Sequence, residues 1–177
     1  MKAPSTSQLR SGKSIAAFAA CAAAAIALLA LLWPVGRLSV TCGGEMLIAW
    51  PIDKGERFEI TFTHSLNLSP ITDVVEWTGS DLVVVKSIFK TFGAGVPVPA
   101  DGVGSELVRV GDHYELLGID KHMQSISILL QETPDHHLSF NGREASLLEA
   151  AGPGSTVEIK VSTVPRVVRY MQGKGAS

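Results

Sequence analysis

Along most of the chain, apolar and polar residues alternate in short segments. A period of two places the apolar side chains on one face of a β-strand. The clearest case is the segment 57–64, in which Phe58, Ile60, Phe62 and His64 share one face. Further strands are expected at 37–41, 46–50, 73–78, 82–91, 106–110, 114–119, 125–131, 138–140, 143–147 and 156–162. The pattern predicts an all-β fold of about ten short strands, either a β-sandwich or a partly open barrel.

Turn residues separate these segments. Asn141-Gly142 is the strongest hairpin signal, because both residue types accept the positive φ angles of a two-residue hairpin. Gly111-Asp112 predicts a second tight hairpin, and residues 147–151 have room for one helical turn.

The N-terminal part of the chain has a different pattern. Residues 15–35 form a run of uncharged residues dominated by Ala, Leu and Ile. A helix of roughly 20 residues crosses a hydrocarbon core of about 30 Å, so the run predicts one transmembrane helix. Because Lys2, Arg10 and Lys13 precede it, the N-terminus is expected in the cytoplasm. The alternative is a signal peptide cleaved between Ala30 and Ser39, which also exports the rest of the chain.

The expected organisation follows from this run. Residues 1–14 form a cytoplasmic N-terminus, 15–35 the transmembrane anchor or signal segment, 37–164 a periplasmic β domain and 165–177 a basic C-terminal tail. The chain is thus expected to be a single-pass protein of the inner membrane. Three of the 15 basic residues precede the run and all 17 acidic residues follow it, which leaves 12 basic residues and a net charge of −5 beyond Val35. This acidic balance argues against nucleic acid as a partner.

The cysteines and most of the histidines do not suggest a metal site. Cys21 lies inside the apolar run and Cys42 just beyond it, so the two cannot readily pair, and no Cys-x-x-Cys motif is present. Neighbouring residues of a strand diverge, so His136-His137 is unsuited to one metal ion, and these histidines are expected in exposed loops together with His113 and His122. No metal or cofactor is expected.

His64 and Asp73 are the most unusual pair of polar residues. His64 ends an apolar row, and Asp73 shares a face with Val75 and Trp77 on the next strand. If the two strands form a hairpin with both rows turned into the core, His64 and Asp73 meet at one rim. A carboxylate there would fix the imidazole tautomer and raise its pKa. The alternative is a rim histidine that bonds to the backbone and ties down the loop.

Two other features near this pair are open to different interpretations. Ser65 follows His64, but there is no Gly-x-Ser-x-Gly elbow and no oxyanion loop, so no catalytic residue is assigned. The stretch 92–104 is rich in Gly and Pro; it is either a contact loop or simply a mobile one, and it lacks the Lys and Ser/Thr of a phosphate loop.

These motifs resemble a bacterial family called domain of unknown function 1850. The resemblance covers about residues 38–161 and rests on the segments 62–65, 69–73 and 92–97. It implies small exported proteins associated with tripartite ATP-independent periplasmic (TRAP) transporters that use TAXI substrate-binding proteins. It gives no catalytic residues. The candidate binding or interaction positions are His64, Ser65, Pro70, Asp73, Gly93, Ala94, Gly95 and Pro97.

Three functions remain open at this point. The first is a membrane-anchored accessory module that contacts a TRAP transporter permease or its solute-binding protein. The second is an exported small-molecule-binding or enzymatic domain that uses His64 and Asp73, which requires a concave pocket containing both residues and the glycine-rich loop. The third is a structural envelope protein.

Overall fold

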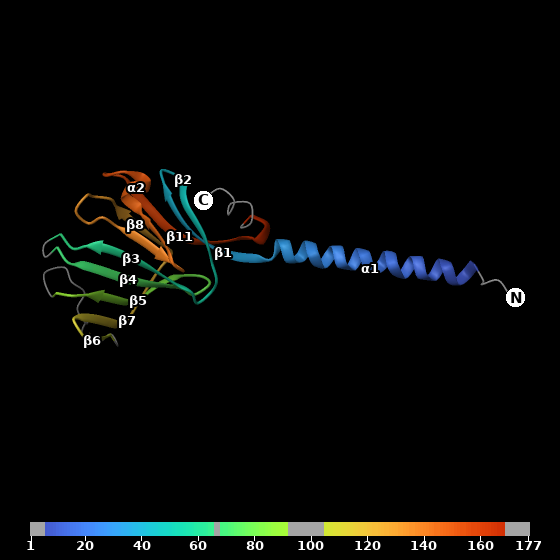
Figure 1. Cartoon of the computed structure of the whole chain (residues 1–177), viewed down its shortest axis with the longest axis horizontal. Helices are drawn as coiled ribbons and strands as arrows, with labels where there is room; N and C mark the ends of the chain where they lie inside the picture. The colour runs from blue at the N-terminus through green and yellow to red at the C-terminus, as the bar shows by residue number, and fades with distance from the viewer. Residues whose placement is uncertain (1–5, 66–67, 92–104, 169–177) are drawn as a thin grey trace. The chain divides into compact units, whose positions relative to one another are not determined.

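The computed structural model describes residues 6–65, 68–91 and 105–168, with the backbone alone for residues 6–16. It divides into two units, one made of Met1–Val35 with Val164–Ser177 and the other of Gly36–Thr163. The helix α1 (Thr6–Leu32) belongs to the first unit and the β domain to the second. Figure 1 labels most of the elements along the chain.

In the first unit, every residue of α1 from 17 to 32 is exposed. The exposed side chains include Phe18, Leu29 and Leu32. The carbonyl oxygen of Trp33 accepts a hydrogen bond from the backbone nitrogen of Arg166 at 3.0 Å. Within the described ranges, no helix combines the length and the apolar character needed to cross a membrane.

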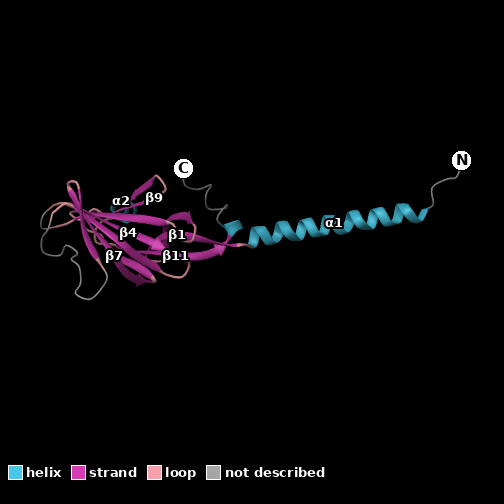
Figure 2. Cartoon of the chain, turned by 90° about the horizontal axis from the view of Figure 1, so that it is seen from below, coloured by secondary structure: helices cyan, strands magenta, loops and turns pink. Residues whose placement is uncertain are grey.

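The second unit contains two antiparallel sheets. The strands are β1 (Pro34–Cys42), β2 (Glu45–Ile52), β3 (Arg57–Thr63), β4 (Pro70–Trp77), β5 (Leu82–Phe89), β6 (Glu106–Val110), β7 (His113–Met123), β8 (Ser125–Leu129), β9 (His137–Phe140), β10 (Arg143–Ser146) and β11 (Thr156–Pro165). The smaller sheet has the order β2-β1-β11-β8, and the larger one β10-β9-β3-β4-β5-β7-β6. Strands make up most of the folded domain (Figure 2). The predicted all-β fold is therefore confirmed, and of the two predicted forms the two antiparallel sheets correspond to the β-sandwich.

The core lies between the two sheets. Both sheets contribute fully buried side chains to one cluster, among them Leu38, Val40, Ile52, Phe58, Val75, Leu130, Leu138, Val157 and Ile159. A second cluster on the larger sheet is built on Ile71, Phe89 and Leu116. Burial of such side chains contributes roughly 1.5–3 kcal/mol each before the entropy cost of ordering them.

Local signals in the sequence are matched at the turns. Asn141 and Gly142 have φ angles of 48° and 74°, as a two-residue hairpin between β9 and β10 requires. The predicted helical turn is α2 (Leu147–Ala151), which begins where the Ser146 hydroxyl accepts a hydrogen bond from the Glu149 backbone nitrogen at 3.1 Å.

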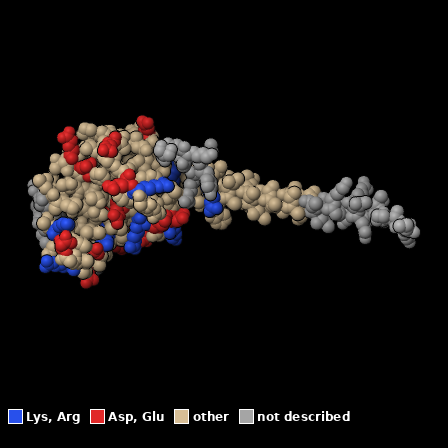
Figure 3. All heavy atoms as spheres, viewed as in Figure 1, with Lys and Arg blue, Asp and Glu red and all other residues tan. Residues whose placement is uncertain are grey.

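The charged residues of the domain do not segregate by sign. On the face shown in Figure 3, acidic and basic side chains lie intermixed. Ion pairs such as Arg57–Glu76 at 2.8 Å and Lys86–Glu115 at 3.1 Å join strands of the larger sheet.

Candidate functional site

Asp73 lies in the middle of an apolar row on the inner face of the larger sheet. The register places Ile60 of β3 opposite it on one side and Ser87 of β5 on the other. Residues paired in this way have Cβ atoms about 5 Å apart. The row continues to Leu138 of β9 at one end, and to Leu116 and Leu107 at the other. The Asp73 carboxyl and the Ser87 hydroxyl thus lie in a row whose other members are apolar.

The surroundings of Asp73 disfavour its charged form. Desolvation by burial raises the pKa of the carboxyl, whereas the Ser87 hydroxyl and the charge of Lys121 lower it by smaller amounts. Ser87 is fully buried. The Ser87 hydroxyl lies near the Asp73 carboxyl, but its distance and angles do not meet the usual criteria for a hydrogen bond with any group in the described part of the chain. The cost of burial therefore outweighs the favourable effects of Ser87 and Lys121 at the Asp73 carboxyl.

A cavity of about 200 Å³ opens beside Asp73. Its walls are mostly apolar and come from both sheets. Three polar side chains face it, those of Asp73, Lys121 and His136. The apolar lining residues are Ile60, Phe62, Val75, Val84, Met123, Ile126 and Ile128. An apolar cavity with a few convergent polar groups is the usual form of a small-molecule site.

Contacts of its backbone and of its ring fix His136 in the wall of the cavity. Its carbonyl oxygen accepts a hydrogen bond from the Leu147 backbone nitrogen at 2.9 Å, and Pro134 receives one from Thr63 in the same way. The imidazole stacks on Phe62 with 5.3 Å between ring centroids. Burial lowers the pKa of His136, so the ring is neutral near pH 7. Its buried Nδ1 has no hydrogen-bond partner among the residues that the structure describes.

Lys121 is an exposed residue that lines the edge of the cavity after a bulge in β7. The pairing of β5 with β7 shifts between Val84 and Lys86, and Gly118 and Asp120 take positive φ angles of 67° and 48°. A bulge changes which residues of a strand face inward. Beyond it, Lys121 pairs with Val84 and turns its side chain toward the cavity.

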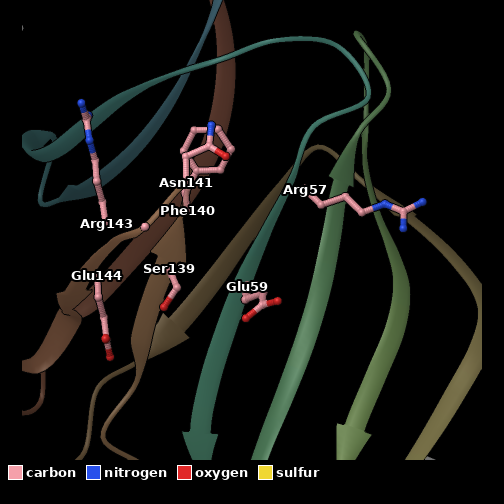
Figure 4. Close-up of a pocket in the computed structure, with 8 residues that line it drawn as sticks. Arg57, Glu59, Ser139, Phe140, Asn141, Arg143 and Glu144 are labelled. Carbon is pink, nitrogen blue, oxygen red and sulfur yellow. The ribbon is translucent and has the colours of Figure 1, made fainter.

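A second hollow lies on β3, β9 and β10 and has a volume of about 300 Å³. Figure 4 shows that its charged side chains diverge: Arg57 extends away from the hollow, and Arg143 and Glu144 point in opposite directions. Arg57 is already paired with Glu76. Because its polar groups do not converge, the larger hollow is a weaker candidate than the cavity at Asp73.

The structure separates His64 from Asp73. The predicted hairpin forms and Asp73 points inward, but the register sets Asp73 opposite Ile60, and the Phe62–Ile71 pair lies between it and His64. The His64 backbone nitrogen bonds instead to the Ser69 carbonyl at 2.9 Å. The expected meeting of His64 and Asp73 at one rim is therefore wrong. His64 lies four positions beyond Ile60, the residue opposite Asp73, and four residues along a strand span about 13 Å.

The other predicted positions lie around the connection between β3 and β4 or outside the described residues. Ser65 is exposed, and Pro70 is the exposed first residue of β4, paired with Thr63. Gly93, Ala94, Gly95 and Pro97 belong to the stretch 92–104, which is outside the described residues.

The part of the sequence that forms this cavity matches a known protein family. The profile of a family described as a domain of unknown function, DUF1850, matches residues 58–147. The chain belongs to this family. The DUF1850 segment runs from β3 to the start of α2 and contains every residue that lines the cavity. Comparison with curated proteins and with solved structures finds no significant match.

Sequence analysis missed two of the three polar groups in the DUF1850 cavity. His136 was expected in an exposed loop, but its ring is half-buried on Phe62, while His137 turns to the other side between Asp135 and Glu144. The strand expected at 114–119 continues to Met123. Gly118 within a strand pattern is a bulge signal, and it could have indicated that Lys121 lies beside the cavity.

Metal binding has no support from side-chain clusters. Within the part of the chain that the structure describes, no three His, Cys, Asp or Glu side chains gather closely enough to hold an ion. The chemistry of the cavity is that of hydrogen bonding and charge at an apolar wall.

Proposed function

We propose that this DUF1850 domain is an exported, membrane-anchored binding module that holds a small solute in the cavity at Asp73. The single observation that carries the proposal is the placement of Asp73 in an apolar row beside a cavity that Lys121 and His136 also face. A partly buried carboxyl whose desolvation outweighs its favourable contacts costs stability, and functional sites are where proteins keep such groups.

The alternative role for these polar groups is purely structural. A structural buried network has its donors and acceptors matched within the protein. Here the buried Nδ1 of His136 lacks a partner among the described residues. A ligand that supplies hydrogen-bonding groups would satisfy this part of the cavity wall.

The anchor completes the proposal. The uncharged run 15–35 is long enough for a membrane-spanning helix, and the basic residues before it favour export of the domain. The exposed apolar side chains of α1 favour a lipid environment, because in water they would leave a large apolar surface uncovered. β1 follows α1 after one residue, so the anchor would tether the domain directly.

Thermal unfolding of the full chain in detergent micelles tests the binding function. A panel of amino acids, carboxylates, amines and polyols should contain solutes that raise Tm, because a ligand that binds only the folded state stabilises it. Val84→Phe, which fills the cavity, should abolish that rise. Val110→Phe at the exposed edge strand β6 is the matched control and should retain it. The proposal would be contradicted if no solute of the panel raised Tm, or if every rise persisted in Val84→Phe.

A second candidate function is an accessory module of a TRAP-type transporter. It is favoured by the connection between β3 and β4, where Leu68 is 69% exposed with a φ angle of 50°. The Leu68 backbone nitrogen bonds to the His64 carbonyl at 2.9 Å, which presents the apolar side chain outward.

Affinity capture from membranes separates this candidate from ligand binding. Leu68→Asp should lose a transporter permease or its solute-binding protein from the captured material. Leu129→Asp on β8, which is 55% exposed in the native chain, is the control and should retain it. Capture of neither protein by the native chain would contradict the transporter role.

A further inference from the structure

We propose that the cavity at Asp73 binds a zwitterion, namely a free α-amino acid with a short apolar side chain. This inference rests on the proposed binding function and adds the class of ligand. It follows from the charges, the lining and the size of the cavity.

The cavity carries one charge of each sign. Asp73 lies on β4 and Lys121 on β7, with β5 between them. Adjacent strands are about 4.8 Å apart, so the two backbones are about 10 Å apart across the sheet. Neither side chain joins an ion pair in the described ranges, although Lys121 is close enough to lower the Asp73 pKa. Two opposite charges that attract without contact leave room for a ligand bearing the complementary pair.

Ligands with a single charge fit less well. A simple carboxylate would be attracted by Lys121 but repelled by Asp73, and a simple amine would meet the reverse. A zwitterion places its ammonium group at Asp73 and its carboxylate at Lys121, which makes both interactions favourable. Ionic contacts of this kind are strengthened where water is partly excluded.

His136 adds a third polar contact. Its neutral ring accepts a hydrogen bond at Nδ1 when the proton is on Nε2. Nδ1 is buried and lacks a partner among the described residues. An ammonium group has three hydrogens to donate, so once bound to Asp73 it would also bond to this nitrogen after a small turn of the imidazole toward the cavity.

The lining and volume define the rest of the ligand. The remaining wall is made of aliphatic, methionine and aromatic side chains, which favours an apolar substituent. The cavity of about 200 Å³ is smaller than the roughly 300–1,000 Å³ of pockets that hold drug-sized ligands. A compound of valine's size fits this description better than a sugar, a nucleotide or a peptide.

Isothermal titration calorimetry of the full chain in detergent micelles tests the inference with three matched probes. L-valine carries both charges, 3-methylbutanoate lacks the ammonium group and isobutylamine lacks the carboxylate. Valine is expected to bind at least about 10-fold more tightly than either analogue, as a site built around hydrogen-bonding groups discriminates against ligands that lack them. Asp73→Asn should weaken valine binding by a similar factor, and Asp53→Asn on the exposed β2–β3 turn should not change it.

The outcomes separate this inference from the binding function itself. Isobutylamine or 3-methylbutanoate binding as tightly as valine would overturn the zwitterion. The zwitterion would also be overturned if only solutes other than amino acids gave a Tm rise that Val84→Phe removes. In both cases the binding function would stand. If no solute stabilises the native chain through the cavity, both proposals fail.

Discussion

Asp73 lies directly opposite Ile60 across the β3–β4 hairpin, so a carboxyl group and a buried aliphatic side chain share one row of the inner face. Burial raises the Asp73 pKa, which means that folding shifts the carboxyl toward its protonated form relative to the unfolded chain. Below the unfolded pKa, near 3.9, the group is protonated in both states and costs nothing. As pH rises through the folded pKa, the carboxyl ionises inside the fold and stability is lost.

Asp73→Asn should therefore stabilise the ligand-free protein at pH 7 by about 1 kcal/mol, with the gain shrinking toward pH 4. Urea unfolding followed by tryptophan fluorescence across this pH range measures it. Asp112→Asn is the control of opposite sign, because Lys90 and His113 lower the pKa of this exposed carboxyl. Its contribution is present above the unfolded pKa and is lost as pH falls. Equal stability of Asp73→Asn and the native chain at pH 7 would contradict the unfavourable burial.

His136 should titrate below the ordinary histidine value of about 6.5. Because the folded state favours the neutral ring, its contribution to stability is complete above pH 6.5 and declines as pH falls toward the folded pKa. Ring resonances in an NMR titration measure the pKa directly. His136→Gln should remove this part of the decline in urea unfolding between pH 7 and pH 5. A His136 pKa at or above 6.5 would show that the ring is not desolvated on Phe62.

Gly36→Ala should destabilise the domain by roughly 1–3 kcal/mol, as overpacking of a closed core does. A Cβ atom at Gly36 would collide with the Trp77 ring and with the Ile52 carbonyl oxygen. Gly43→Asn is the control, since no atom lies within 4 Å of its Cβ position and Asn tolerates a φ angle of 58°. Chemical unfolding of both variants gives the comparison, and equal midpoints would show that Trp77 does not pack on Gly36.

The proposed anchor predicts membrane retention that depends on α1. Replacing Leu28 and Leu31 together by Lys should release the protein from membranes washed with carbonate, because charges within a membrane span each cost about 2.5–3.5 kcal/mol. Lysines at Met46 and Leu129, which are exposed apolar residues of the β domain, should leave it membrane-bound. Release of the native chain by carbonate would argue against a retained anchor, and its measured mass would show whether cleavage is the cause.

The sequence predicted the strands well because alternation reports directly on which face of a strand is buried. The segment 57–64 and the hairpin at Asn141-Gly142 needed no information from elsewhere in the chain. The length of β7 could not be obtained in this way, because its bulge at Gly118 interrupts the alternation. The period of two thus identified the strand but not the position of Lys121 beside the cavity.

The candidate site was only partly predictable for a different reason. Asp73 stood out because a charge interrupted an apolar row, and the hairpin placed that row inside as expected. Its partners depend on register and on contacts between distant segments: Ser87 comes from β5, and His136 lies 63 positions further along the chain. Proximity along the sequence favoured His64 instead, which the register places beyond the Phe62–Ile71 pair.

The most direct test of the central claim is methyl NMR of the full chain, with Ile and Val labelled, during titration with L-valine. The account predicts that resonances of Ile60, Val84 and Ile126 shift with a common saturation curve, because these side chains line the cavity. Val108 and Val110 on the edge strand β6 should not change. Shifts confined to residues outside the cavity, or none from any solute of the panel, would contradict a binding site at Asp73.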